Sequence, residues 1–152
     1  MAHGKSCRGI DNGMIGPSES AAEVLQFPTH ADERGCLTVI EQGVDLPFSF
    51  KRLYYFAAPG PGKVRGDHAH RLSHTALIAL GGSFEVHVDD GLHRSTYRLD
   101  APDRGLVVPP RHWLRVDSFL PGSLCLVLSS HLHDENDYYR DYEAFRRMVG
   151  CG

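Results

Sequence analysis

A long series of short apolar runs, each ended by a turn signal, limits the possible folds of this chain more than any other feature. The runs are too short for the helices of a bundle and have the length of strands. They span residues 24–27, 37–41, 51–57, 75–80, 83–89, 93–99, 105–108 and 124–129. Glycine, proline and aspartate separate them, as in Pro59–Gly62 and Asp89–Gly91. Because these residues favour tight turns, we expect an antiparallel all-β domain.

Local patterns add detail to this expectation. Asp90 and Gly91 join two alternating runs, which predicts a β-hairpin. The runs 75–80 and 124–128 are almost continuously apolar, as strands buried on both faces are. Only the end of the chain suggests a helix, capped by Asn136 or Asp137. Its apolar side would hold Tyr138, Tyr142, Phe145, Met148 and Val149. The sequence therefore predicts a jelly-roll barrel with a short C-terminal helix.

Composition excludes several classes of partner. The 152 residues carry a formal net charge of −3 with neutral histidines, so neither nucleic acid nor a membrane surface is an expected partner. No apolar run approaches the ~18 residues of a membrane-spanning helix. The glycine- and serine-rich start predicts a flexible arm over residues 1–22, followed by one domain over residues 23–150. None of the four cysteines forms a Cys-x-x-Cys pair, which favours a reduced, cytoplasmic protein.

Three histidines precede the apolar run 75–80. His68 and His70 are two residues apart and His74 follows four later, so one extended strand would point all three to the same face. Histidine titrates near neutral pH and is the commonest metal ligand. The cluster therefore predicts a proton-transfer site or a metal site, with purely structural hydrogen bonds as the third interpretation.

The spacing of this segment resembles the first motif of the cupin superfamily, whose members are small double-sheet jelly rolls. The positions of the motif are occupied by Gly62, His68, His70, His74 and Gly81. His74 stands where cupins usually carry a glutamate. In metal-binding cupins a later strand adds a histidine; in the matching region this chain has His112, and Leu114 stands at about the ligand position. Three histidines could still hold a zinc ion with an open fourth position.

Further segments resemble one cupin family, the sugar-nucleotide 3,4-ketoisomerases that act on dTDP-4-keto-6-deoxyglucose. They occur in the order of that family over nearly the whole chain after the arm. The matching segments are Asp32–Leu37, Leu46–Tyr55, Arg65–Arg71, Gly82–Ser83, Asp89–Gly91, Gly105–Leu106, Trp113 and Asp134–Tyr142. The resemblance implies a dTDP-linked keto sugar as substrate and a homodimer of jelly rolls that exchanges strands between subunits.

The implied reaction moves a carbonyl from C4 to C3 of a hexose through an enediol or enediolate. A base removes the C3 proton, which the neighbouring ketone makes acidic, and a proton returns at C4. This chemistry needs groups that titrate near neutral pH and donors to the oxyanion, but no redox cofactor and no metal. We expect His68 to carry the proton and His70 to assist by a hydrogen bond or proton relay. Tyr54 would orient a hydroxyl or stabilise the oxyanion, or else pack inside the barrel.

Substrate binding needs cations for the diphosphate and a surface for the base. Arg65, close before His68, and Arg34, in the early turn, are the expected diphosphate ligands, or else solvated surface arginines. Trp113 is expected to stack on the thymine ring or to fill the core. Packing of the terminal helix on the barrel or on a partner subunit is the role expected of Tyr138, Tyr139, Arg140 and Tyr142.

Two other functions remain open at this point. One is a metal-dependent cupin enzyme that uses His68, His70 and His74. The other is a non-catalytic cupin that only binds a sugar nucleotide. Because a binding module has little need for paired titratable histidines, the ketoisomerase is the leading hypothesis.

Overall fold

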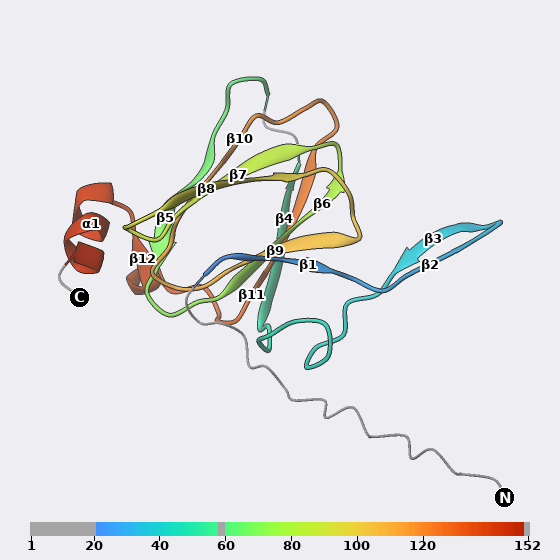
Figure 1. Ribbon diagram of the computed structural model, residues 1–152, viewed down its shortest axis with the longest axis horizontal. Coiled ribbons are helices and arrows are strands. Elements are labelled where there is room, and N and C mark those ends of the chain that lie inside the picture. The colour runs from blue at the N-terminus through green and yellow to red at the C-terminus, as the bar shows by residue number, and fades with distance from the viewer. Residues whose placement is uncertain (1–20, 58–59, 151–152) are drawn as a thin grey trace, which may run out of the picture.

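The computed structural model describes residues 21–57 and 60–150, and it shows two antiparallel five-stranded sheets packed face to face (Figure 1). The strands are β1 (Glu23–Gln26), β2 (Thr29–Asp32), β3 (Gly35–Thr38), β4 (Arg52–Ala57), β5 (Arg65–His70), β6 (Thr75–Gly81), β7 (Phe84–Asp89), β8 (Arg94–Leu99), β9 (Arg104–Val108), β10 (Trp113–Asp117), β11 (Leu124–Ser129) and β12 (Tyr138–Tyr139). The 3₁₀ helix η1 (Glu135–Asp137) precedes β12, and α1 (Tyr142–Gly150) follows it. The predicted all-β jelly roll with a short C-terminal helix is confirmed.

The first sheet has the strand order β1-β9-β6-β11-β4, and its central strands are buried on both faces. Leu77 of β6 and Val127 of β11 lie opposite each other and face the core between the sheets. Their neighbours Ile78 and Leu128 join a second cluster with Phe27 on the outer face. The continuously apolar runs therefore reflect burial on both faces, as predicted.

The second sheet has the order β12-β5-β10-β7-β8 and closes the other side of the barrel (Figure 1). On β7, Phe84, Val86 and Val88 are buried, whereas Glu85 and His87 between them are only half-buried. This alternation gives the sheet one apolar face toward the core and one polar face toward solvent.

The predicted hairpin at Asp90 and Gly91 is confirmed, because β7 pairs with β8 across this turn. The Gly91 N–H donates to Asp89 Oδ1 at 2.7 Å, and Gly91 has a φ of +97°. That left-handed backbone angle favours glycine, so the glycine at this position predicts the turn.

Strands β2 and β3 form a hairpin of their own that extends away from the barrel (Figure 1). They pair with each other and with no strand of either large sheet. Seven residues of the hairpin strands are exposed, including Leu37, and Thr38 is half-buried. The barrel of this chain therefore leaves the hairpin largely uncovered.

Helix α1 begins at Tyr142, later than the sequence predicts. The side chain of Asp141 accepts a backbone N–H of its first turn at 2.7 Å. The expected cap at Asn136 or Asp137 is wrong, because the carboxylate of Asp137 accepts hydrogen bonds from the loop after β5 instead. Phe145 is fully buried and anchors the helix to the barrel. No helix in the described part of the chain is long and apolar enough to span a membrane.

The arm predicted for residues 1–22 lies almost entirely outside the described residues. Ala22, at its end, packs against the main core, and its carbonyl accepts a hydrogen bond from the Tyr97 hydroxyl at 3.4 Å. The domain that starts at residue 23 is thus joined to the last residue of the arm by packing.

Candidate active site

A bulge in β5 decides which of its side chains face the barrel interior. Leu114 of β10 lies opposite His68, but Arg115 lies opposite Gly66, so Asp67 is an extra residue in the pairing. Gly66 has a φ of +81°, and a Cβ at this position would lie 2.8 Å from the Leu114 carbonyl oxygen. Only glycine fits there. The bulge turns Asp67 toward the outer face of the sheet and His68 into an interior cavity.

The cavity has a volume of about 390 Å³ and lies between the two sheets. Its polar wall consists of Arg52, Tyr54, Arg65, His68, His133, Tyr138 and Arg140. Its apolar wall consists of Phe56, Leu77, Leu114, Val116 and Val127. A cavity that combines an apolar wall with convergent polar groups is typical of a small-molecule site.

Two side chains of this cavity, Arg52 and His68, hold a buried nitrogen without a partner among the described residues, and of the two only the His68 imidazole can accept a proton. Its ring hydrogen-bonds the Gly66 backbone, which makes Nδ1 the donor to the Gly66 carbonyl, and its buried Nε2 has no partner among the described residues. Burial, and next the charge of His70, lower the pKa of His68 to about 4, although the Gly66 carbonyl opposes this shift. At neutral pH His68 is therefore a neutral imidazole whose Nε2 lone pair is free to accept a proton.

His70 lies deeper and is held by Asp137. Its Nδ1 lies 2.9 Å from Asp137 Oδ2, and its buried Nε2 has no partner among residues 21–57 and 60–150. The rings of His68 and His70 are 5.0 Å apart in an edge-to-face arrangement. Burial lowers the pKa of His70, and Asp137 opposes that shift.

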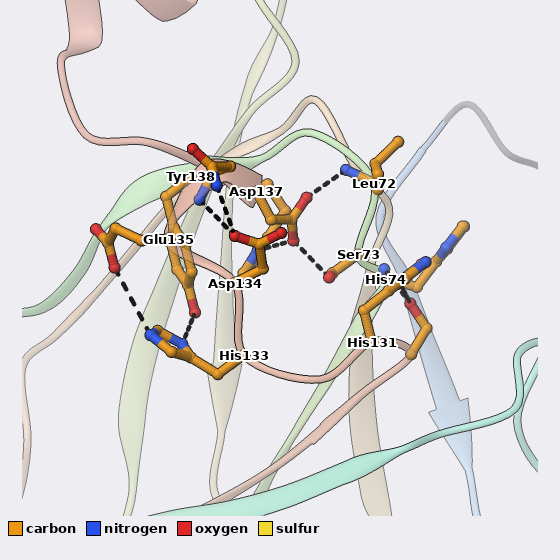
Figure 2. A network of polar contacts seen from close by, with 12 residues as sticks. Leu72, Ser73, His74, His131, His133, Asp134, Glu135, Asp137 and Tyr138 are labelled. Carbon is orange, nitrogen blue, oxygen red and sulfur yellow. Dashed lines mark hydrogen bonds and ion pairs between the residues drawn. The ribbon is translucent and has the colours of Figure 1, made fainter.

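Asp137 collects its hydrogen bonds from the loop that follows β5. Its Oδ2 accepts from the Ser73 hydroxyl at 2.5 Å, and its Oδ1 accepts from the Leu72 N–H at 2.7 Å (Figure 2). Burial by itself raises the pKa of Asp137, but the hydrogen bonds from Ser73, Leu72 and His70 outweigh it and hold the pKa below its usual value. Asp137 is therefore a carboxylate at neutral pH.

Two tyrosines line the cavity beside the histidines. Burial, and next the proximity of Tyr138, raise the pKa of Tyr54 to about 12, so its hydroxyl stays protonated as a donor. The Tyr138 hydroxyl accepts from Arg52 Nη2 at 3.2 Å, and its ring centroid lies 5.0 Å from that of His68. Tyr138 pairs across β12 with His70, so it lines the cavity instead of packing the terminal helix as predicted.

The two expected diphosphate ligands lie in different places. Arg65 lines the cavity with its guanidinium 5.4 Å from the centre of the Phe56 ring. Arg34 lies in the turn of the β2–β3 hairpin, where it is exposed and paired with Asp32. Within one chain the structure therefore brings Arg65, but not Arg34, to His68.

Trp113 lies on the opposite face of the second sheet. Its ring contacts Tyr142 and Phe145 of α1 at centroid distances of 5.1 and 5.7 Å. Because side chains alternate along β10, Leu114 faces the cavity and Trp113 faces away from it. Trp113 therefore packs against α1 outside the core of the barrel, and within one chain it is not brought to His68.

The expectation that three histidines share one face is wrong. The chain leaves β5 after His70 and turns before β6, so His74 stacks on Phe48 at a centroid distance of 5.7 Å. Among the described residues, the set whose ligand atoms lie within 4.8 Å of one another is Glu85, His87 and Asp117 on the outer face. The metal-dependent alternative therefore loses the arrangement on which it rested.

A larger hollow of about 680 Å³ lies on the outer face of the second sheet, beside Trp113. Two of its arginines are paired with carboxylates: Arg94 with Asp89 at 2.9 Å, and Arg115 at 3.1 Å with Asp117, which does not line the hollow. None of its described lining residues holds a buried polar atom without a partner. We therefore place the functional site in the smaller interior cavity.

Sequence reasoning did not identify the segment His133–Arg140 as part of the site. Tyr138, Tyr139 and Arg140 were expected to pack the terminal helix on the barrel or on a partner subunit, because the helix was predicted to begin several residues too early. The extended pair Tyr138–Tyr139 next to β5 brings Tyr138 and Arg140 to the cavity and Asp137 to His70. A better signal was the run Asp134–Asp137, whose four polar residues are typical of a turn.

Comparisons with known proteins show which family the chain belongs to. The family model described as "FdtA: WxcM-like, C-terminal" matches residues 20–150. A TDP-4-oxo-6-deoxy-alpha-D-glucose-3,4-oxoisomerase of Aneurinibacillus thermoaerophilus is 37% identical over 127 residues, which cover 84% of this chain and 91% of that protein.

Solved structures are similar over the same region. A 3,4-ketoisomerase from Helicobacter canadensis has a TM-score of 0.82 and 36% identity, covering 85% of this chain and 97% of that one. QdtA, a sugar 3,4-ketoisomerase from Thermoanaerobacterium thermosaccharolyticum solved with TDP, has a TM-score of 0.83 and 33% identity, covering 86% and 95%. The chain therefore belongs to the FdtA (WxcM-like, C-terminal) family of cupin-fold isomerases.

Proposed function

We propose that this chain is a sugar-nucleotide 3,4-ketoisomerase that converts dTDP-4-keto-6-deoxyglucose into a dTDP-3-keto-6-deoxyhexose through an enediol. The activity named for its relatives supports this substrate class. The observation that carries the proposal is the free, buried Nε2 of His68 in a cavity of sugar size. Neither a redox cofactor nor a metal takes part in the proposed reaction.

His68 moves the proton between carbons. Its Nε2 accepts the C3 proton, the electron pair forms the enediolate, and the protonated ring, whose N–H exchanges with solvent, returns a proton to C4 as the carbonyl forms at C3. The nitrogen is suited to this because Gly66 occupies Nδ1 and keeps Nε2 as the acceptor. Binding of an anionic substrate beside His68 favours the protonated ring, and so supports proton abstraction.

Tyr54 and His70 support the oxygens of the sugar. Tyr54, a protonated donor with a raised pKa, donates a hydrogen bond to the oxyanion at C4 as it develops. His70 assists by a hydrogen bond or proton relay beside His68. Arg65 binds the diphosphate, because its guanidinium lines the same cavity beside the Phe56 ring.

The protein acts as a homodimer in this proposal. The β2–β3 hairpin, which is largely uncovered by its own barrel, packs on the partner subunit, and Leu53 and Tyr55 on the outer face of β4 are further exposed apolar side chains for that contact. Arg34, at the tip of the hairpin, then reaches the cavity of the partner. The proposal also places the enzyme in the cytoplasm, in keeping with the free thiols of Cys36 and Cys125.

Proton NMR of the purified protein with dTDP-4-keto-6-deoxyglucose in deuterated water tests the reaction. Deuterium entering the ring together with a new 3-keto product is the expected result, and it should persist in the presence of a chelator. A folded protein that binds the nucleotide but gives neither exchange nor product would contradict the proposal and favour a binding-only cupin.

A mixed-dimer experiment tests the place of Arg34. Arg34→Ala and His68→Asn are each expected to lower turnover as homodimers. A heterodimer of the two variants would regain one intact cavity, and therefore part of the activity, if Arg34 acts in the cavity of the partner. A heterodimer as inactive as its parents would contradict the exchange, as would a monomer in light scattering.

A further inference from the structure

Asp137 is hydrogen-bonded to His70, the second histidine of the site, and the proposed reaction gives Asp137 no role. Its carboxylate lies at the centre of a buried network that joins η1 to the loop after β5 (Figure 2). Three donors point at it: His70 Nδ1, the Ser73 hydroxyl and the Leu72 N–H. All of these contacts lie behind the cavity wall, because Asp137 is 7% exposed and does not line the cavity.

This network determines which nitrogen of His70 carries the proton. A carboxylate only accepts hydrogen bonds, and the low pKa of Asp137 keeps it ionised, so His70 Nδ1 must be the donor. In the neutral ring Nε2 is then an acceptor, and this is the nitrogen that has no partner in the described structure. The Tyr138 ring, 4.6 Å from the His70 ring, holds the imidazole from another side.

We propose that Asp137 is a positioning residue for catalysis: it acts through His70, fixing the Nδ1–H tautomer so that Nε2 is presented as a proton acceptor beside His68. This inference rests on the proposed ketoisomerase function. Isomerisation moves a proton between oxygens as well as between carbons, since O3–H is lost when O4–H forms. This exchange needs a second proton acceptor beside His68, and Nε2 of His70 supplies one, because the two ring centroids lie 5.0 Å apart.

The charged and titratable groups around His70 are consistent with this role. Asp137 favours its protonated form, while the charges of Arg52 and Arg140 disfavour it. His68 and Tyr138 contact it as rings. Asp137 is thus the group that opposes both burial and the two arginines, and its loss would leave His70 a poorer acceptor.

The first measurement is made on the wild-type protein. Nitrogen NMR of the histidine-labelled chain, with the His70 signals assigned by a His70→Gln variant, reads the protonation of each ring nitrogen. An unprotonated Nε2 and a protonated Nδ1 at neutral pH are expected. The opposite tautomer would overturn the proposal, whether or not the enzyme isomerises the expected sugar.

The second measurement compares Asp137→Asn with Asp134→Asn, which makes the same chemical change in the same turn but away from His70. Because an asparagine amide can donate to Nδ1, Asp137→Asn is expected to reverse the tautomer and to lower kcat by about 10²-fold with little change in KM. Asp134→Asn should retain both the tautomer and the kcat. Ser73→Ala keeps the charge, so it should retain the tautomer with a smaller loss of kcat.

The outcomes separate the two proposals. If the wild type turns over and folded Asp137→Asn keeps its kcat, the positioning role is wrong while the ketoisomerase function stands. If the wild type shows the expected tautomer but no isomerisation, the proposed function is wrong, and with it the positioning role. If Asp137→Asn does not fold, the wild-type tautomer and the Ser73→Ala kinetics still decide the matter: an Nε2–H ring or a loss of kcat as large as that of His68→Asn would contradict the proposal.

Discussion

The two faces of the second sheet differ in a way that identifies the site. The outer face carries the larger hollow, about 680 Å³, where Arg94 and Arg115 are paired with the carboxylates of Asp89 and Asp117. The inner face borders a cavity of about 390 Å³, in which His68 has a buried nitrogen without a partner. A buried polar atom left unpaired has a free-energy cost that a merely structural site would avoid. Between these two hollows, the buried nitrogen without a partner is therefore a better guide to function than volume.

Two histidines on opposite faces allow the strongest test of this difference. His68→Asn is expected to lower kcat by about 10³-fold or more, because it removes the proton acceptor, while binding of dTDP measured by calorimetry is retained. His87→Asn, on the outer face, should keep kcat, since His87 only pairs with Thr96 and Asp117. Equal losses of kcat in both variants would contradict the placement of the site on the inner face.

Arg65 in the inner cavity and Arg115 on the outer face test whether substrate binding also differs between the two faces. Arg65→Ala is expected to raise KM by about 10- to 100-fold with a smaller effect on kcat, because a charge-assisted contact to the diphosphate is lost. Arg115→Ala removes an exposed pair with Asp117 and should leave KM unchanged. Steady-state kinetics measure both KM values. An unchanged KM in Arg65→Ala would show that the diphosphate binds elsewhere.

The acid side of the pH–rate profile gives a further test. Because burial lowers the pKa of His68 to about 4, kcat/KM should not fall around pH 6.5, where an exposed histidine titrates, but only near pH 4. Rates measured between pH 4 and pH 8, with folding checked at each pH, give this profile. A fall centred near pH 6.5 would show that His68 is not shielded from water as described.

The smallest expected effect is on stability. The pKa of His68 is lower in the folded chain than in the unfolded one, so its contribution is complete above pH 6.5 and is lost as the pH falls toward 4. Between pH 7 and pH 5 this is expected to lower the free energy of unfolding by roughly 1–2 kcal/mol. Urea unfolding at both pH values should show a smaller decrease in His68→Asn, whereas His87→Asn should behave as the wild type does.

Several features of the fold could be predicted from sequence because their causes are local. The Asp90–Gly91 hairpin follows from a turn that needs a left-handed glycine, and the burial of β6 and β11 follows from their apolar runs. The helix start could not be predicted in the same way. Asp137 has the chemistry of a cap, and only its contacts with Ser73 and His70 show that it is engaged elsewhere.

Only part of the site could be predicted from the sequence. The alternation along an extended strand is enough to bring His68 and His70 together, but it also predicted His74 beside them, and the chain turns away before that residue. Tyr138 comes from a segment far away in sequence, and the alternation of β10 places Trp113 outside the cavity.

The sequence by itself determined the all-β barrel, the paired histidines and the resemblance to sugar-nucleotide ketoisomerases, because strand periodicity and a short motif are local properties. Only the tertiary structure decided which ring nitrogen of His68 and of His70 has no hydrogen-bond partner among the described residues. Gly66 occupies one side of His68 through a bulge set by β10, and Asp137 occupies one side of His70 from the other end of the chain. Hydrogen bonds between distant segments fix the protonation of a ring, and no local pattern in the sequence carries that information.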